Sequence, residues 1–131
     1  MKIIVDAFGG DNAPLEIIKG SAMAISEYGI EIILCGKEDI IKKVMAENNI
    51  SSAGITIVNA DEIITMEDEA NSVMKAKSNS SMAVGFKLLK DGAGDAFVTA
   101  GNSGATLMGA SLIIKRIKGV KRAALAPLLP N

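Results

Sequence analysis

The chain has 131 residues, about one domain, and its 49% hydrophobic and 22% charged residues indicate a folded protein rather than a disordered or fibrous one. Its 14 basic and 15 acidic residues leave no positive excess, so nucleic acid is not an expected partner. The absence of His removes the imidazole base of Ser/His/Asp hydrolases and the commonest zinc ligand. We therefore expect no metal and no cofactor.

The sequence also bears on the protein's compartment. A single Cys excludes an internal disulfide, and no apolar run is long enough to span a bilayer. The chain begins directly with a strand pattern and has no signal-like segment, so we expect a cytoplasmic protein. Cys35 ends an apolar run with no base in view and is expected to be a small buried core residue.

The first half of the chain alternates between two hydrophobic periods. Short apolar runs predict strands, and apolar residues at helical spacing predict the helices between them. The strands are expected at residues 2–6, 30–35 and 55–59, and the helices at 15–28 and 37–49.

The second half continues this alternation after an interruption. Residues 61–79 are polar and acidic around a short apolar run, so we expect a mobile, partly helical segment over the strand ends. A helix to about residue 90, a strand at 95–99, a helix at 103–118 and a strand at 122–131 follow. Leu112 and Ile114 are expected on the apolar side of the 103–118 helix. Such alternation predicts an α/β fold with a parallel sheet covered on both faces and ligands at the carboxyl ends of the strands.

The first glycine turn follows the strand that ends at Asp6. Gly9 and Gly10 allow backbone conformations closed to other residues, and Asp11 or Asn12 can satisfy free amides. The turn lacks the spaced glycines of a dinucleotide fingerprint and the Gly-Lys-Ser/Thr of a P-loop. Asp6 is equally compatible with a carboxylate that bonds loop amides and with a site residue.

The second glycine turn, Gly101-Asn102-Ser103-Gly104, joins a predicted strand to a predicted helix. It places hydrogen-bonding side chains and unpaired N–H groups together, an arrangement that favours an anion such as phosphate. The alternative is an ordinary strand-to-helix turn in which Asn102 is only an N-cap.

A serine-rich helix start lies between these turns in sequence. Ser80 or Ser81 is expected to cap the helix that runs to about Lys90, and Lys77 is a cation near that start. A solvated basic loop is the simpler account of Lys77.

Four stretches carry a family resemblance. They are Asp6-Ala-Phe-Gly-Gly-Asp-Asn-Ala-Pro14, Lys77-Ser-Asn-Ser-Ser-Met82, Thr99-Ala-Gly-Asn-Ser-Gly104 and Arg122-Ala-Ala-Leu-Ala-Pro-Leu-Leu-Pro130. In this order and spacing they resemble the phosphate acyltransferase (PlsX) family of bacterial phospholipid synthesis. The chain departs from the family's usual pattern at Phe8, where Met is usual, and at Ser78-Asn79, which replaces a more charged pair.

The resemblance implies a fold and an activity. The fold would be a three-layer α/β/α arrangement similar to isocitrate and isopropylmalate dehydrogenases, with residues 1–131 as one domain from the N-terminal part of a longer chain. The activity would be transfer of a fatty acyl group from acyl carrier protein to inorganic phosphate. A membrane acyltransferase would use the acyl phosphate, and the full-length protein would be a homodimer associated peripherally with the membrane.

The resemblance also gives roles to residues. Asn102 and Ser103, with the amides around Gly101 and Gly104, would hold the phosphate or acyl phosphate. Gly9 and Gly10 would let the backbone approach substrate, while Asp11 and Asn12 fix their loop and Asp6 orients it. Ser80, Ser81 and Lys77 would contact phosphate or the phosphopantetheine arm, and Arg122 is a weaker candidate.

Two alternatives stay open. The chain could be a nucleotide- or phosphate-binding module that uses the same turns without catalysis. It could also be inactive alone because the rest of the active site lies in missing residues.

Overall fold

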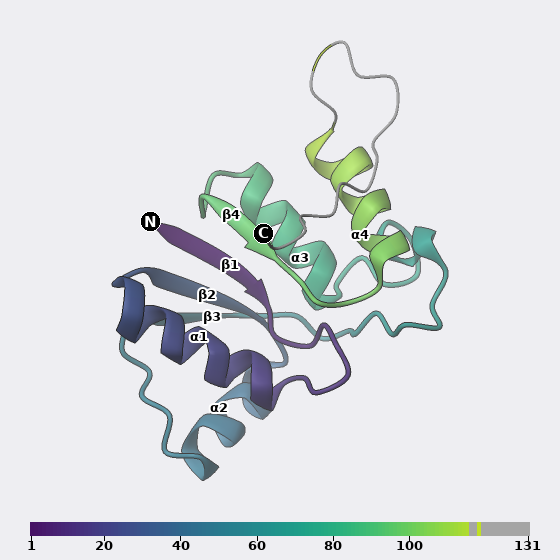
Figure 1. Ribbon diagram of the computed structural model, residues 1–131. Coiled ribbons are helices and arrows are strands. Elements are labelled where there is room, and N and C mark those ends of the chain that lie inside the picture. Colours follow the sequence, from purple (N-terminus) through teal and green to yellow (C-terminus); the bar gives the residue numbers. More distant parts are fainter. Residues whose placement is uncertain (116–117, 119–131) are drawn as a thin grey trace, which may run out of the picture.

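The computed structural model describes residues 1–115 and 118 (Figure 1). The strands are β1 (Lys2–Asp6), β2 (Glu31–Gly36), β3 (Ile55–Asn59) and β4 (Ala96–Val98). The helices are α1 (Leu15–Tyr28), α2 (Glu38–Glu47), the 3₁₀ turn η1 (Ala70–Val73), α3 (Ser81–Lys90), α4 (Ser103–Gly109) and the π-helical turn η2 (Ala110–Ile114).

The four strands form one parallel sheet in the order β3-β2-β1-β4. Val5 of β1 lies opposite Val98 of β4, and Asp6 lies opposite Cys35 of β2. The parallel sheet predicted from the alternation is confirmed. Because all strands run in one direction, the loops that follow β1, β3 and β4 meet at the same edge.

Helices lie on both faces of the sheet (Figure 1), as expected for three α/β/α layers. On one face, α1 and α2 pack through Ile18 and Ile41 against a core that includes Leu34. On the other, α3 packs against Ile4 and Ile33, which point the opposite way because side chains alternate along a strand. The closer likeness to isocitrate dehydrogenases stays a prediction.

The segment between β3 and α3 is partly helical, as predicted, because it contains η1. It also supplies buried residues to a second core beside α3 and α4. Ile64 and Val73 pack there with Phe86 and Ala105. The segment is thus anchored through apolar side chains as well as through its polar contacts.

The last described helix is shorter than predicted. The expected helix over residues 103–118 ends at Ile114, and the next residue, Lys115, has a positive φ of 74°. The final turn is π-helical, with the N–H of Lys115 donating to the carbonyl of Ala110 at 2.9 Å. The strand predicted at 122–131 lies outside the described residues. Among the residues that are described, no helix is long and apolar enough to cross a membrane.

Candidate functional site

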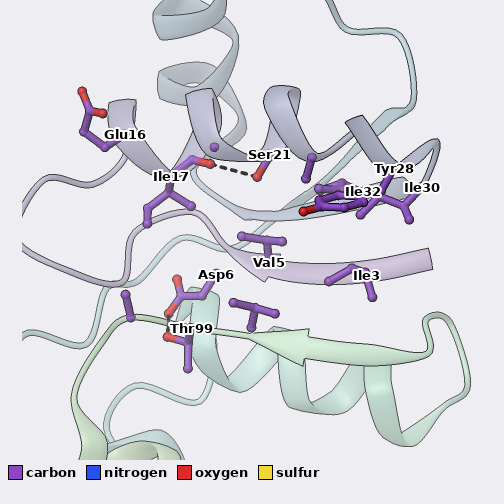
Figure 2. Close-up of a pocket in the computed structure, with 14 residues that line it drawn as sticks. Ile3, Val5, Asp6, Glu16, Ile17, Ser21, Tyr28, Ile30, Ile32 and Thr99 are labelled. Atoms are coloured by element: carbon purple, nitrogen blue, oxygen red, sulfur yellow. Dashed lines mark hydrogen bonds between the residues drawn. The ribbon is translucent and has the colours of Figure 1, made fainter. Parts of the chain in front are cut away.

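A buried carboxylate connects the two glycine turns. Asp6, at the end of β1 and only 2% exposed, accepts a hydrogen bond from the N–H of Phe8 at 3.1 Å. Its other oxygen accepts from the hydroxyl of Thr99 at 2.8 Å, and that hydroxyl accepts from the N–H of Gly101 at 3.1 Å. Figure 2 shows the side chains of Asp6 and Thr99 turned toward one another at the strand ends. Thr99 is the first residue of the Thr99–Gly104 stretch, but the sequence pattern gave its side chain no role.

The turns also touch directly. A Cβ on Gly9 would lie 2.7 Å from Thr99 Oγ1, 2.8 Å from Asp6 Oδ2 and 2.9 Å from the nitrogen of Gly101. Gly10 has a φ of 108°, a conformation that favours glycine, and packs on Ala100. The two glycine turns therefore meet at the carboxyl edge of the sheet. Gly9 is required by close approach, and Gly10 by backbone geometry.

Asn102 is buried and fully engaged within the protein. Its Oδ1 caps α4 by accepting from the N–H of Ala105 at 3.1 Å, the N-cap geometry that the simpler interpretation predicted. Its Nδ2 donates to the carbonyls of Thr65 at 3.0 Å and Asp68 at 2.9 Å, and more weakly to Met66 at 3.5 Å. One side chain thus joins the second glycine turn to the loop that follows β3.

Lys77 holds the same loop from the other side. Its ammonium group donates to Asp68 Oδ2 at 2.6 Å and to the carbonyl of Ile63 at 2.7 Å. The ion pair with Lys77, followed by the N–H of Thr65, lowers the pKa of Asp68 below its ordinary 3.8. Lys77 is therefore not the solvated cation of the simpler interpretation, and its charge is directed at Asp68.

The serines at the start of α3 are buried rather than open to the edge. Ser80 is 0% exposed and caps α3 by accepting from the N–H of Ala83 at 3.1 Å. Ser81 is 2% exposed, and its N–H donates to the carbonyl of Glu62 at 3.0 Å. The predicted cap is confirmed.

Other predicted residues lie exposed at the edge. Asp11 and Asn12 are exposed in the first turn, and Ser103 and Gly104 are exposed in the second. A cavity of about 270 Å³ separates the first turn from the loop after β3. Its lining consists of Phe8, Gly10, Asp11 and residues 63–67.

Among the described residues, the remaining polar and nucleophilic candidates add no further site. Arg122 lies outside the described residues. Within the described part of the chain, no cluster of His, Cys, Asp and Glu has the geometry of a metal site. Cys35 is buried, as predicted, and burial together with the nearby charge of Asp6 raises its pKa to about 12. Its thiol is therefore held in the neutral, unreactive form.

Comparison with known proteins assigns the family. The sequence profile of the family described as "Fatty acid synthesis protein" matches residues 1–131. The chain belongs to this family. It is similar to proteins named phosphate acyltransferase from Acetivibrio thermocellus, at 47% identity, and from Thermoanaerobacterium thermosaccharolyticum, at 48%. A third, from Geobacter sulfurreducens, is 40% identical.

These matches cover only part of each relative. All of this chain is aligned, but it spans 39% of the Acetivibrio protein and 38% of the other two. The matched range spans both glycine turns and the loop between β3 and α3.

Proposed function

We propose that this chain forms part of an enzyme that transfers a fatty acyl group from acyl carrier protein to inorganic phosphate. The observation that carries the proposal is the contact between the two glycine turns, fixed by the hydrogen bond from Thr99 to Asp6. This contact places small residues and the exposed Ser103 at the carboxyl edge of a parallel sheet, where α/β proteins bind ligands. The name phosphate acyltransferase on the relatives supports the reaction class.

The reaction needs no nucleophile from the protein. A phosphate oxygen attacks the carbonyl carbon of the thioester, a C–O bond forms, and the carbonyl oxygen becomes a tetrahedral oxyanion. Collapse breaks the C–S bond, releasing the carrier's thiolate, which takes a proton from water. The protein must hold phosphate close to the thioester and stabilise the oxyanion. A chain without His is suited to such chemistry.

The second glycine turn is the proposed phosphate site. Ser103 is exposed beside Gly101 and Gly104, so its hydroxyl is available to donate to a phosphate oxygen. Backbone amides of the same turn would add donors, and small residues leave room for the anion. Ser103 is therefore the side chain that we assign to direct contact with the reacting groups.

Asn102 has a different part in the proposal. Since both ends of its amide are engaged, it acts by holding the 65–68 loop against the second turn. Lys77 holds that loop through Asp68, and Ser80 fixes the start of α3. Ser81, beside Ser80, belongs to the same buried support. These are positioning residues around the site.

The first glycine turn forms the wall of the proposed site that faces the second glycine turn. Gly9 and Gly10 bring backbone close to the substrate, and Asp11 and Asn12 are exposed at the rim. The cavity of about 270 Å³ beside Gly10 is the proposed entry for the carrier's phosphopantetheine arm. Asp6 orients both turns, because its two oxygens are directed at Phe8 and Thr99 and a bare carboxylate would repel phosphate.

Arg122 is proposed to add positive charge near the phosphate. The full-length polypeptide is proposed to be a cytoplasmic, membrane-associated homodimer with an isocitrate dehydrogenase-like architecture. It would hand its acyl phosphate to a membrane acyltransferase.

The test is acyl phosphate formation from acyl carrier protein thioester and labelled phosphate. The chain alone is compared with a polypeptide of the relatives' full length that contains it. Turnover by the longer polypeptide is the expected result. If neither turns over and both bind adenine nucleotide instead, the protein is a binding module and the proposal is wrong.

A further inference from the structure

An open apolar groove runs along the sheet beside α1. It has a volume of about 440 Å³, and its floor is formed by Ile3, Val5 and Val98. Figure 2 shows Ile3 and Val5 on this floor and the helix α1 as the wall above them. Val98 is 54% exposed, although it is an apolar residue of a parallel sheet. Parallel sheets are normally covered on both faces, so the groove is a part of the sheet face that the described helices leave uncovered.

Within residues 1–115, the elements next to the groove do not fill it. The chain passes from β1 through α1 to β2 and through α2 to β3 on the groove side, moving away from β4. It returns to β4 through α3 on the other face, and α4 then packs beside α3. Right-handed crossovers fix these faces. Within the described residues no element covers β1 and β4 on the α1 side, so a layer there has to come from sequence outside that part of the chain.

The wall of the groove has the shape of a helix-packing surface. Gly20 and Ala24, one turn apart on α1, both line the groove. Gly20 costs helix stability, and a Cβ placed there would meet nothing within 4 Å. A glycine with no neighbour suits the close approach of another backbone rather than the local packing of α1.

We infer that the groove seats an apolar helix supplied by the region that follows residue 131 in polypeptides of the relatives' length. Those relatives are more than twice as long as this chain, so they contain ample sequence for such a helix. The groove reaches Asp6 and Thr99 at one end, where the two glycine turns meet. The seated helix therefore also closes one side of the candidate site. This inference does not depend on the reaction proposed above.

Cysteine accessibility tests the inference. Gly20→Cys and Val98→Cys are made in the 131-residue chain and in a full-length polypeptide that contains it, and labelling by a maleimide is followed by mass spectrometry of the tryptic peptides. Met23→Cys is the matched control, because Met23 is on α1, 67% exposed and not in the groove lining. The buried Cys35 is an internal reference for foldedness.

We expect both groove cysteines to label readily in the short chain and at least about tenfold more slowly in the full-length polypeptide. A tenfold decrease corresponds to about 1.4 kcal/mol for seating the helix in the groove. Met23→Cys should label alike in both. Equal labelling of all three sites in the longer polypeptide overturns the inference. Protection of the short chain that grows with its concentration identifies a second copy as the occupant, and protection that requires added palmitate identifies an acyl chain. Either result also overturns the inference. If Gly20→Cys does not fold, the labelling of Val98→Cys alone tests the inference.

Discussion

Thr99 donates a 2.8 Å hydrogen bond to Asp6, a residue 93 positions earlier in the chain. The bond links the end of β4 to the end of β1, which are paired in the sheet up to Val5 and Val98. Because each residue is followed by a glycine turn, one hydrogen bond sets the separation of the two turns. The candidate site depends on this separation.

Gly9→Ala should disturb the junction most directly. The new methyl group would lie under 3.0 Å from Thr99 Oγ1, Asp6 Oδ2 and the backbone of Gly101, so the turns must move apart. We expect a loss of about 1–3 kcal/mol in the free energy of urea unfolding, the usual cost of overpacking. Gly20→Ala is the control and should stabilise α1 by up to about 1 kcal/mol. Equal stabilities of the Gly9 variant and the parent would contradict the described packing.

Asn102→Ala should release the loop after β3. The change removes the cap of α4 and leaves the carbonyls of Thr65 and Asp68 without their amide donor. We expect a loss of about 2–3 kcal/mol in unfolding free energy and faster amide exchange at residues 65–68. Asn71→Ala is the control, because Asn71 is exposed and its side chain makes no hydrogen bond among the described residues. Unchanged exchange in the 65–68 loop would show that Asn102 does not hold it.

Stability should fall in acid through the pair of Asp68 and Lys77. The pKa of Asp68 is lowered in the folded state, first by Lys77 and then by Thr65, so folding is favoured when this carboxyl is ionised. The contribution is full above the ordinary value of 3.8 and is lost as the pH falls through the lower, folded pKa. Urea unfolding of the parent and Lys77→Met should therefore differ most at neutral pH. In strong acid the difference should shrink to the part due to the hydrogen bond from Lys77 to the carbonyl of Ile63.

The control for this pH dependence is Lys43→Met. Lys43 forms a looser pair with Glu47 at 3.9 Å, with both side chains well exposed, and such pairs contribute little. Its substitution should leave the stability nearly unchanged at both pH values. A difference between the parent and Lys77→Met that stays constant into strong acid would argue against the assigned ion pair.

Cys35 should be inert until the protein unfolds. Its side chain is fully buried and its pKa is raised to about 12, so little thiolate exists at mildly alkaline pH. A chromogenic disulfide reagent should give no fast reaction with the native chain and a stoichiometric reaction in concentrated guanidinium chloride. Rapid reaction of the native thiol would mean that β2 is more accessible than described.

Most of the fold could be predicted from periodicity. The runs at β1, β2 and β3 and the helical spacing of α1 gave correct elements, since each signal is local. The end of the last helix was predicted wrongly. Its π-helical turn shifts the apolar face, so that Ile113 is buried while Leu112 is 52% and Ile114 37% exposed. Such a turn leaves the 3.6-residue period, and nothing in the local sequence marks it.

The site was predicted in outline but not in its connections. Glycine-rich turns after apolar strands correctly indicated which loops meet, because parallel strands place their carboxyl ends together. The partners of Asn102 lie 34 to 37 residues away in an irregular loop, and the carboxylate paired with Lys77 lies nine residues before it. These contacts depend on tertiary placement of the 60–79 segment. Local pattern cannot specify them.

The phosphate dependence of turnover in Ser103→Ala tests the central claim most directly. In a full-length polypeptide containing this chain, loss of the Ser103 hydroxyl should lower kcat/KM for phosphate by about 10²–10³, the scale of one lost oxyanion donor. Ser52→Ala is the control, because Ser52 is exposed before β3 at the opposite edge of the sheet. Reduced turnover in Ser103→Ala alone supports a phosphate site at the second glycine turn. Unchanged kinetics in Ser103→Ala would contradict it.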